Sequence, residues 1–257
     1  MSEVAINKKA FPLHLEGRGK KAVLIIHGYT GYPGEFYELA HALNSEGYRV
    51  SLPRLPGHGT NKSDFLKTGW KDWLNHIKDA YSKLEAEYSS VSIVGLSMGG
   101  VLALILAAEF NPERIALLAP AMAVKSRTFY LSPLLKYFRK EIPKQWNPLP
   151  TDGPDIKELG REYWSYNFPG QLANLYKLIR IAGKSLKKVH CPTLIMLSEL
   201  DDSVPVNVGP MLEKKLVKCP VKNVILKKSP HVLVSGEEKE YVKKEVIQWI
   251  TQGDNNE

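Results

Sequence analysis

The chain has 257 residues, of which 44% are apolar and 24% are charged. This composition is that of an ordinary globular protein and excludes a disordered chain, and the length fits a single α/β domain. The formal net charge is +8, but the 35 Lys and Arg residues are interspersed with 27 Asp and Glu residues. Because no nucleic-acid-binding motif accompanies this charge, we expect a solvated basic surface and no nucleic-acid partner.

Targeting and metal-binding signals are weak. The longest apolar run, residues 101–108, is too short to cross a bilayer, so we expect no stable membrane insertion. The N-terminal residues lack the apolar segment of a secretory signal peptide, which favours a cytoplasmic protein. The two cysteines, Cys191 and Cys219, do not have metal-ligand spacing, and we expect free thiols and no metal site.

Strands and helices alternate along the first half of the chain. Apolar runs bounded by turn residues predict strands at 11–15, 22–26, 48–52, 91–94 and 115–118. Apolar residues at helical spacing predict helices at 36–46, 70–88 and 98–110. This alternation predicts a mostly parallel central sheet with helices on both faces.

The alternation stops after the 115–118 strand. Residues 121–188 contain many aromatic residues but no convincing buried strand, and a structureless loop of this length is improbable in a compact domain. We therefore expect a helical cap at 121–188, inserted into a core formed by residues 1–120 and 189–257. In the second part of the core, the pattern predicts strands at 193–197 and 221–226 and helices at 208–216 and 239–250.

The 91–94 strand runs directly into Gly95-Leu96-Ser97-Met98-Gly99. This pentapeptide matches G-x-S-x-G, in which a tight strand-to-helix turn lifts the serine hydroxyl above the edge of the sheet. The two glycines remove the side chains that would collide where strand and helix cross. Since a strand precedes the motif and a helix follows it, we interpret Ser97 as a catalytic nucleophile rather than as a serine at a closely packed helix entry.

A serine hydroxyl needs a general base, because it is a poor nucleophile at neutral pH. On a sheet of this kind the partners follow in the order serine, acid, histidine, each beyond the end of a strand. Only His190 and His231 follow Ser97 along the chain. His190 precedes the 193–197 strand and so lies at the wrong end of the sheet. His231, just after the 221–226 strand, is therefore the predicted base.

The acid is expected in the loop after the 193–197 strand, where Asp201 and Asp202 are adjacent. One carboxylate can accept the imidazole N–H, which sets the tautomer and stabilises the imidazolium formed during attack. The other would then be a solvated or turn-capping aspartate. The spacing alone leaves both assignments open.

Acyl transfer also needs two backbone N–H groups directed at the developing oxyanion. The residue after the nucleophile, Met98, provides the first. The loop after the 22–26 strand begins His27-Gly28-Tyr29, and the Tyr29 N–H is the natural second donor. We expect His27 itself to be a structural hydrogen-bonding residue rather than a base.

Five short motifs occur in a fixed order: IIHGYTG at 25–31, PGHG at 56–59, GLSMGG at 95–100, DxxVP at 201–205 and SPH at 229–231. Together they resemble the small bacterial carboxylesterases and monoacylglycerol lipases of the α/β-hydrolase superfamily, over nearly the whole chain. The resemblance implies the α/β-hydrolase fold and the oxyanion donors Tyr29 and Met98. It also favours Asp201 as the acid, because the acid is the first residue of the DxxVP pattern. Pro230 departs from the glycine that many relatives have before the histidine, and should stiffen that loop.

These observations predict a serine hydrolase that cleaves carboxylic esters, short- to medium-chain acyl esters or monoacylglycerols, through an acyl-enzyme and without a metal or organic cofactor. The expected partner is a small-molecule ester. A thioesterase, C–C hydrolase, peptidase or acyltransferase on the same Ser-His-Asp arrangement is the alternative, and a non-catalytic binding protein is less favoured. The aromatic residues of the cap fit an apolar pocket or simple packing, and basic residues around it would aid transient contact with a lipid interface.

Overall fold

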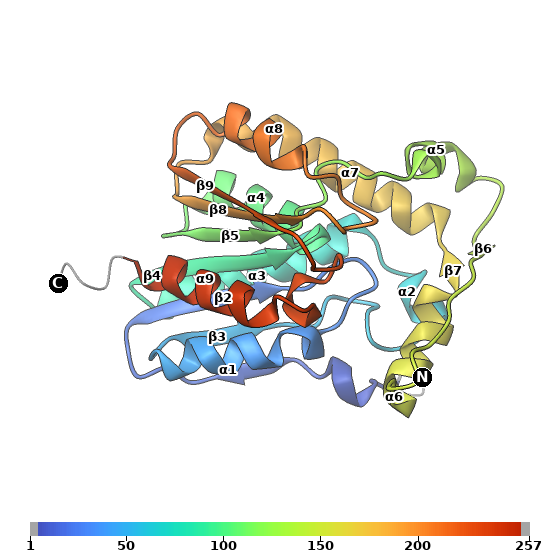
Figure 1. The fold of residues 1–257 in the computed structure, drawn as a ribbon, viewed down its shortest axis with the longest axis horizontal. Helices are drawn as coiled ribbons and strands as arrows, with labels where there is room; N and C mark the ends of the chain where they lie inside the picture. The colour runs from blue at the N-terminus through green and yellow to red at the C-terminus, as the bar shows by residue number, and fades with distance from the viewer. Residues whose placement is uncertain (1–4, 253–257) are drawn as a thin grey trace.

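The computed structural model describes residues 5–252, and it contains a seven-stranded sheet with helices on both faces (Figure 1). The termini assigned above to the core, residues 1–4 and 253–257, lie outside the described residues. The strands in chain order are β1 (Leu13–Leu15), β2 (Lys21–Ile26), β3 (Arg49–Leu52), β4 (Ser90–Leu96), β5 (Ile115–Leu118), β8 (Thr193–Ser198) and β9 (Val221–Leu226). Their order across the sheet is β1-β3-β2-β4-β5-β8-β9, and only the edge pair β1–β3 is antiparallel.

Helices cover the two faces of the sheet unequally. One face carries α1 (Tyr37–Ser45) and α9 (Lys239–Thr251), and the other carries α3 (Trp70–Glu87), α4 (Met98–Phe110), α7 (Pro169–Ser185) and α8 (Val208–Lys215). Side chains along β2 point alternately to the two faces of the sheet. Val23 and Ile25 pack on the side of α1 and α9, while Leu24 and Ile26 pack on the side of α3 and α4. The mostly parallel sheet expected from the sequence is confirmed.

Most predicted elements occur within two residues of their expected ends. The short elements were missed, because four or fewer residues carry no readable hydrophobic period. The predicted 36–46 helix begins with a separate 3-10 turn, and the loop after β3 contains a short helix. These missed elements are η1 (Lys8–Ala10), η2 (Pro33–Phe36), α2 (Lys62–Phe65) and η5 (Leu233–Ser235).

The segment between β5 and β8 is mainly helical. It contains α5 (Arg127–Leu135), β6 (Ile142–Pro143), α6 (Pro154–Leu159), the π-helical turn η3 (Gly160–Trp164), β7 (Tyr166–Asn167), α7 and η4 (Leu186–Lys188). The two-residue strands β6 and β7 pair only with each other. In Figure 1, α5, β6, α6 and β7 lie beyond the carboxyl ends of the parallel strands, whereas α7 packs back along α4.

The helix α4 is apolar on all sides, since it lies between the sheet and α7. Its residues from Met98 to Ala107 are all buried. A helix buried in this way is held by packing along its first ten residues, so its first residue has a well-defined position relative to the end of β4. Among residues 5–252, no helix combines the length and apolar character that a membrane span requires.

An aromatic ring in the short helix α2 connects the core to the segment between β5 and β8. Phe65 is completely buried. Its ring centroid lies 4.9–6.0 Å from the ring centroids of Tyr29, His58, Trp73, Tyr163 and Phe168. Tyr29 belongs to the loop after β2, while Tyr163 and Phe168 belong to the inserted segment. Phe65 therefore stabilises both parts at once.

We expect Phe65→Ala to lower the free energy of unfolding by about 3–5 kcal/mol, because it leaves a cavity among five rings. Phe138→Ala is the matched control, since the Phe138 side chain is 74% exposed and its loss should change stability by less than about 0.5 kcal/mol. Urea unfolding of both variants measures the difference. Equal stabilities would contradict the central position assigned to Phe65.

Candidate active site

Ser97 occupies a strained turn between β4 and α4. Its backbone has φ 55° and ψ −113°, a conformation that non-glycine residues rarely adopt. A Cβ atom added at Gly95 would lie 2.4 Å from the carbonyl oxygen of Gly99, and one added at Gly99 would lie 2.1 Å from that of Ile26. Both positions therefore require glycine. The turn is held by the Ser97 N–H, which donates to the Leu118 carbonyl at 2.8 Å.

The loops after β8 and β9 bring Asp201 and His231 to Ser97. The Ser97 Oγ lies 2.9 Å from Nε2 of His231, and the His231 Nδ1 lies 2.7 Å from Oδ2 of Asp201. Asp201 is completely buried, and His231 is partly exposed. The three side chains come from the carboxyl ends of three parallel strands, which meet at one edge of the sheet.

The two adjacent aspartates have different environments. The Asp201 Oδ1 accepts hydrogen bonds from the N–H groups of Ser203 (2.7 Å) and Val204 (2.9 Å), and its Oδ2 faces His231. Burial alone would raise the pKa of Asp201, but the hydrogen bond and charge of His231, with the two N–H groups, outweigh it and lower that pKa below 3.8. Asp202 is exposed and accepts from the Ser203 hydroxyl instead.

The ionised Asp201 determines which nitrogen of His231 carries the proton. A carboxylate only accepts hydrogen bonds, so Nδ1 of His231 donates to it. The neutral ring then has a free lone pair on Nε2, which can accept the hydroxyl proton of Ser97. This is the tautomer that a general base at this position needs.

The loop carrying His231 is anchored on both sides. The carboxylate of Glu238 accepts from the N–H of Lys228 (2.9 Å) and from the hydroxyl of Ser229 (2.8 Å). The Ser198 hydroxyl, at the end of β8, donates to the carbonyl of Ser229 at 2.5 Å. Sequence reasoning missed Glu238 and Ser198, because neither belongs to a recognisable motif. Pro230 lies within this anchored loop.

The backbone N–H groups of Tyr29 and Met98 have no acceptor among the described residues. The Tyr29 loop passes very close to the serine, since a Cβ at Gly28 would lie 3.3 Å from the Cβ of Ser97. Free backbone N–H groups beside a nucleophile are what an oxyanion hole requires.

His27 holds this loop in place. Its Nδ1–H donates to the carbonyl of Gly28 at 3.0 Å, and its Nε2 accepts from the N–H of Leu55 at 3.1 Å. Burial lowers the pKa of His27 well below 6.5, so the ring stays neutral and both hydrogen bonds persist. The ring thus has the structural hydrogen-bonding role expected for it.

A cavity of about 540 Å³ opens onto Ser97 and His231. Its aromatic wall consists of Tyr29 from the loop after β2 and of five residues from the segment between β5 and β8, namely Phe129, Trp146, Tyr163, Trp164 and Tyr166. Aliphatic side chains such as Leu172 and Leu175 extend this wall, while Lys144 and Asn167 add polar groups. Half of the ten aromatic residues in the segment therefore line the cavity, and the others, such as buried Phe168 and exposed Tyr137, do not.

A half-buried glutamate, Glu35, lies against Gly31 of the Tyr29 loop. The Oε2 atom of Glu35 is buried without a hydrogen-bond partner, and a Cβ added at Gly31 would lie 2.8 Å from it. Burial raises the pKa of Glu35 from 4.5 to about 8. No sequence motif indicates this residue. At neutral pH the Glu35 carboxyl is protonated, which avoids a buried unpaired charge beside the loop.

We expect the free energy of unfolding of the wild type to fall, relative to that of Glu35→Gln, as the pH rises from 4.5 to about 8. In this window the unfolded carboxyl has lost its proton but the folded one keeps it, so folding takes up a proton. The slope is at most about 1.4 kcal/mol per pH unit. Urea unfolding of both proteins across the window measures it. A pH-independent difference between them would show that Glu35 titrates normally.

Comparison with known proteins places the chain among hydrolases. Residues 23–243 match the alpha/beta hydrolase family. A thermostable monoacylglycerol lipase from Bacillus sp. (strain H-257) is 32% identical over 225 residues, which are 87% of this chain and 87% of that protein. A carboxylesterase from Bacillus subtilis (strain 168) is 25% identical over 233 residues, which are 90% and 93% of the two chains.

A solved structure of a lipolytic enzyme has a similar fold. It comes from the work on LipS and LipT, two metagenome-derived lipolytic enzymes, and it superposes with a TM-score of 0.86 at 26% sequence identity. The superposition covers 96% of this chain and 100% of the other.

Proposed function

The chain belongs to the alpha/beta hydrolase family and is a carboxylic ester hydrolase, and we propose that Ser97, His231 and Asp201 are its catalytic triad. The observation that carries this proposal is the continuous chain of short contacts, 2.9 Å from Ser97 to His231 and 2.7 Å from His231 to Asp201. The strained backbone of Ser97 supports it, because such strain is concentrated at reactive positions.

In the proposed cycle, the Ser97 Oγ attacks the ester carbonyl carbon while Nε2 of His231 takes the hydroxyl proton. The carbonyl oxygen becomes an oxyanion, which accepts hydrogen bonds from the N–H groups of Tyr29 and Met98. The C–O bond to the alcohol then breaks, and the imidazolium of His231 gives its proton to the departing alcohol. The acyl group remains bound to Ser97 as an ester.

The second half of the cycle repeats these steps with water. His231 takes a proton from the water as its oxygen attacks the acyl carbon, and the same two N–H groups hold the new oxyanion. The bond to the Ser97 Oγ breaks, the acid leaves, and the proton returns to the serine. Asp201 stays ionised throughout, holds the tautomer of His231 and stabilises its charged form.

The segment 121–188 acts in our proposal as a cap over this site. Its aromatic side chains supply most of the apolar wall of the 540 Å³ cavity. That volume and lining suit a short- to medium-chain acyl ester or a monoacylglycerol. The names of the relatives agree with this substrate class and do not favour thioester, C–C bond or peptide hydrolysis, or acyl transfer.

Three variants test the triad with p-nitrophenyl esters and monoacylglycerols of increasing acyl length. We expect Ser97→Ala to abolish turnover. Asp201→Asn should lower kcat by about 10⁴, because the wrong tautomer of His231 is then favoured. Asp202→Asn is the matched control, since the exposed Asp202 does not contact His231, and its kcat should stay within about threefold of wild type. Turnover by Ser97→Ala, or a larger loss for Asp202→Asn, would refute the assignment.

We also propose transient contact with an anionic lipid surface through α5 and the turn that follows it. Large apolar side chains there are strongly exposed: Leu131 (54%), Leu134 (60%), Tyr137 (76%) and Phe138 (74%). Exposed basic residues lie among them, namely Arg127, Lys136, Arg139 and Lys140. Apolar side chains surrounded by cations are the combination that adsorbs to anionic headgroups. The neighbouring Phe129 lines the catalytic cavity, so adsorption would bring the cavity to the lipid.

We expect the double variant Leu134→Ser/Phe138→Ser to bind phosphatidylglycerol vesicles at least about tenfold more weakly than wild type, because two apolar side chains no longer enter the interface. Phe11→Ser/Val217→Ser is the matched control, as these side chains are similarly exposed but lie elsewhere. Sedimentation with vesicles measures binding. Hydrolysis of a soluble p-nitrophenyl ester should stay unchanged in both variants. Equal vesicle binding by the two variants would exclude this surface.

A further inference from the structure

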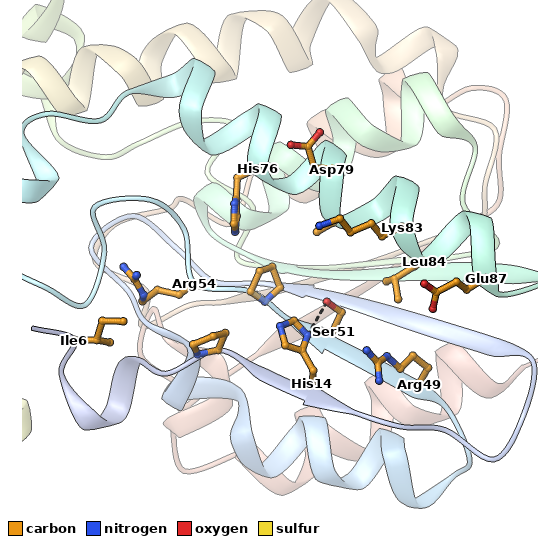
Figure 2. Close-up of a pocket in the computed structure, with 13 residues that line it drawn as sticks. Ile6, His14, Arg49, Ser51, Arg54, His76, Asp79, Lys83, Leu84 and Glu87 are labelled. Carbon is orange, nitrogen blue, oxygen red and sulfur yellow. Dashed lines mark hydrogen bonds between the residues drawn. The ribbon is translucent and has the colours of Figure 1, made fainter. Parts of the chain in front are cut away.

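A second cavity, of about 520 Å³, lies between α3 and the strands β1 and β3, of which β1 is the edge strand (Figure 2). None of its lining residues lines the catalytic cavity. Its polar lining consists of His14, Arg49, Ser51, Arg54, His76, Asp79, Lys83 and Glu87. Nothing in the mechanism above uses these residues, although several of them are cationic.

The sheet itself creates this cavity. On the face covered by α3, β2 presents buried apolar residues such as Leu24, and α3 packs on β2 and β4. On β3, Val50 and Leu52 belong to the opposite core, so the alternate residues Arg49 and Ser51 face the α3 side. His14 is the register partner of Ser51 across β1 and β3. On the α3 side of the sheet, the apolar surface thus ends at β2. Beyond it, beside α3, the sheet presents the polar residues His14, Arg49 and Ser51.

The cations in the lining come from three different elements and keep free donors. The buried Nε–H groups of Arg49 and Arg54 have no acceptor among the described residues. Arg49 contacts Glu16 through its Nη1, and the Arg54 Nη1 donates to the His58 carbonyl at 2.8 Å. Lys83, on α3, forms no hydrogen bond or ion pair with any residue in the described part of the chain.

Among these three cations, only Arg49 is paired with a carboxylate in residues 5–252, through its contact with Glu16. Asp79 and Glu87 belong to the lining, but neither comes within ion-pair distance of a cation in residues 5–252. Figure 2 shows His76 and Lys83 extending from α3 into the space above β1 and β3, while the Asp79 carboxylate points away from the strands in this view.

The pKa values of both histidines of the cavity are lowered, mainly by burial and further by the neighbouring cations. Burial lowers the pKa of His14, and the charges of Arg49 and Lys83 lower it further. The pKa of His76 is also lowered, first by burial and then by Arg54 and Lys83, although Asp79 opposes the change. Both rings are therefore neutral at pH 7 and can donate one hydrogen bond each.

We propose that this cavity binds a small organic phosphate monoester. Guanidinium groups match phosphate oxygens with paired N–H donors, and Lys83 adds a charge on the opposite wall. The volume exceeds that of a phosphate ion, and Pro12, Pro53 and Leu84 supply apolar wall for the organic part of the ligand. The site is separate from the triad, so binding here does not depend on ester hydrolysis.

Isothermal titration calorimetry with glucose 6-phosphate and adenosine monophosphate tests this proposal and separates sugar from nucleotide ligands. We expect saturable binding of at least one of them, with Kd on the order of 1 mM or tighter, and no binding of glucose or adenosine. Lys83→Glu should weaken binding at least about tenfold. Lys71→Glu is the matched control, because it makes the same charge change on α3 outside the cavity.

The outcomes are distinct. Absence of saturable binding for both phosphate esters would overturn the proposal, and so would equal weakening by Lys83→Glu and Lys71→Glu, which would indicate attraction to net charge alone. Lys83 is exposed and has no hydrogen-bond or ion-pair partner among residues 5–252, so its replacement should not disturb folding. Unchanged p-nitrophenyl ester hydrolysis in both variants verifies that they are folded.

Discussion

The close crossing of β4 and α4 at Ser97 is the constraint on which the rest of the site depends. Backbone atoms approach so tightly that no side chain fits at Gly95 or Gly99, and Ser97 is held at φ 55°. A strained turn persists only where its surroundings over-determine it. Here α4, which is buried from Met98 to Ala107, on one side and the central strand β4 on the other supply that restraint.

The parallel sheet brings the other two residues of the proposed triad to Ser97. Because β4, β8 and β9 run in the same direction, the loops after them meet at one edge, and Ser97, Asp201 and His231 come within hydrogen-bonding distance. Each loop is also held by contacts outside the proposed triad. Two N–H groups orient Asp201, Glu238 anchors the loop of His231, and His27 ties the Tyr29 loop to Leu55. The residues proposed to carry out the chemistry are therefore held by rigid elements.

Beyond this edge, the molecule divides into surfaces of different character. The aromatic cluster around Phe65 joins the core to the segment that walls the catalytic cavity. That segment also exposes the apolar side chains of α5. The far edge of the sheet is instead polar, since β3 carries Arg49 and Ser51 on the face where β2 carries Leu24. A lipid surface and a phosphate ester are thus proposed for two separate regions of one chain.

The sequence by itself determined the order of the main elements and the serine turn, and it singled out His231 as the proposed base, because these depend on local hydrophobic period, local sterics and position along the chain. Resemblance was needed to prefer Asp201 over Asp202. Only the tertiary structure separated them by burial and contact with His231, and only it identified Glu35, Glu238 and the α3 cavity. These features come from residues far apart along the chain. The raised pKa of Glu35, the hydrogen bonds of Glu238 and the lining of the α3 cavity all arise from burial and proximity in the folded chain, which no local sequence pattern encodes.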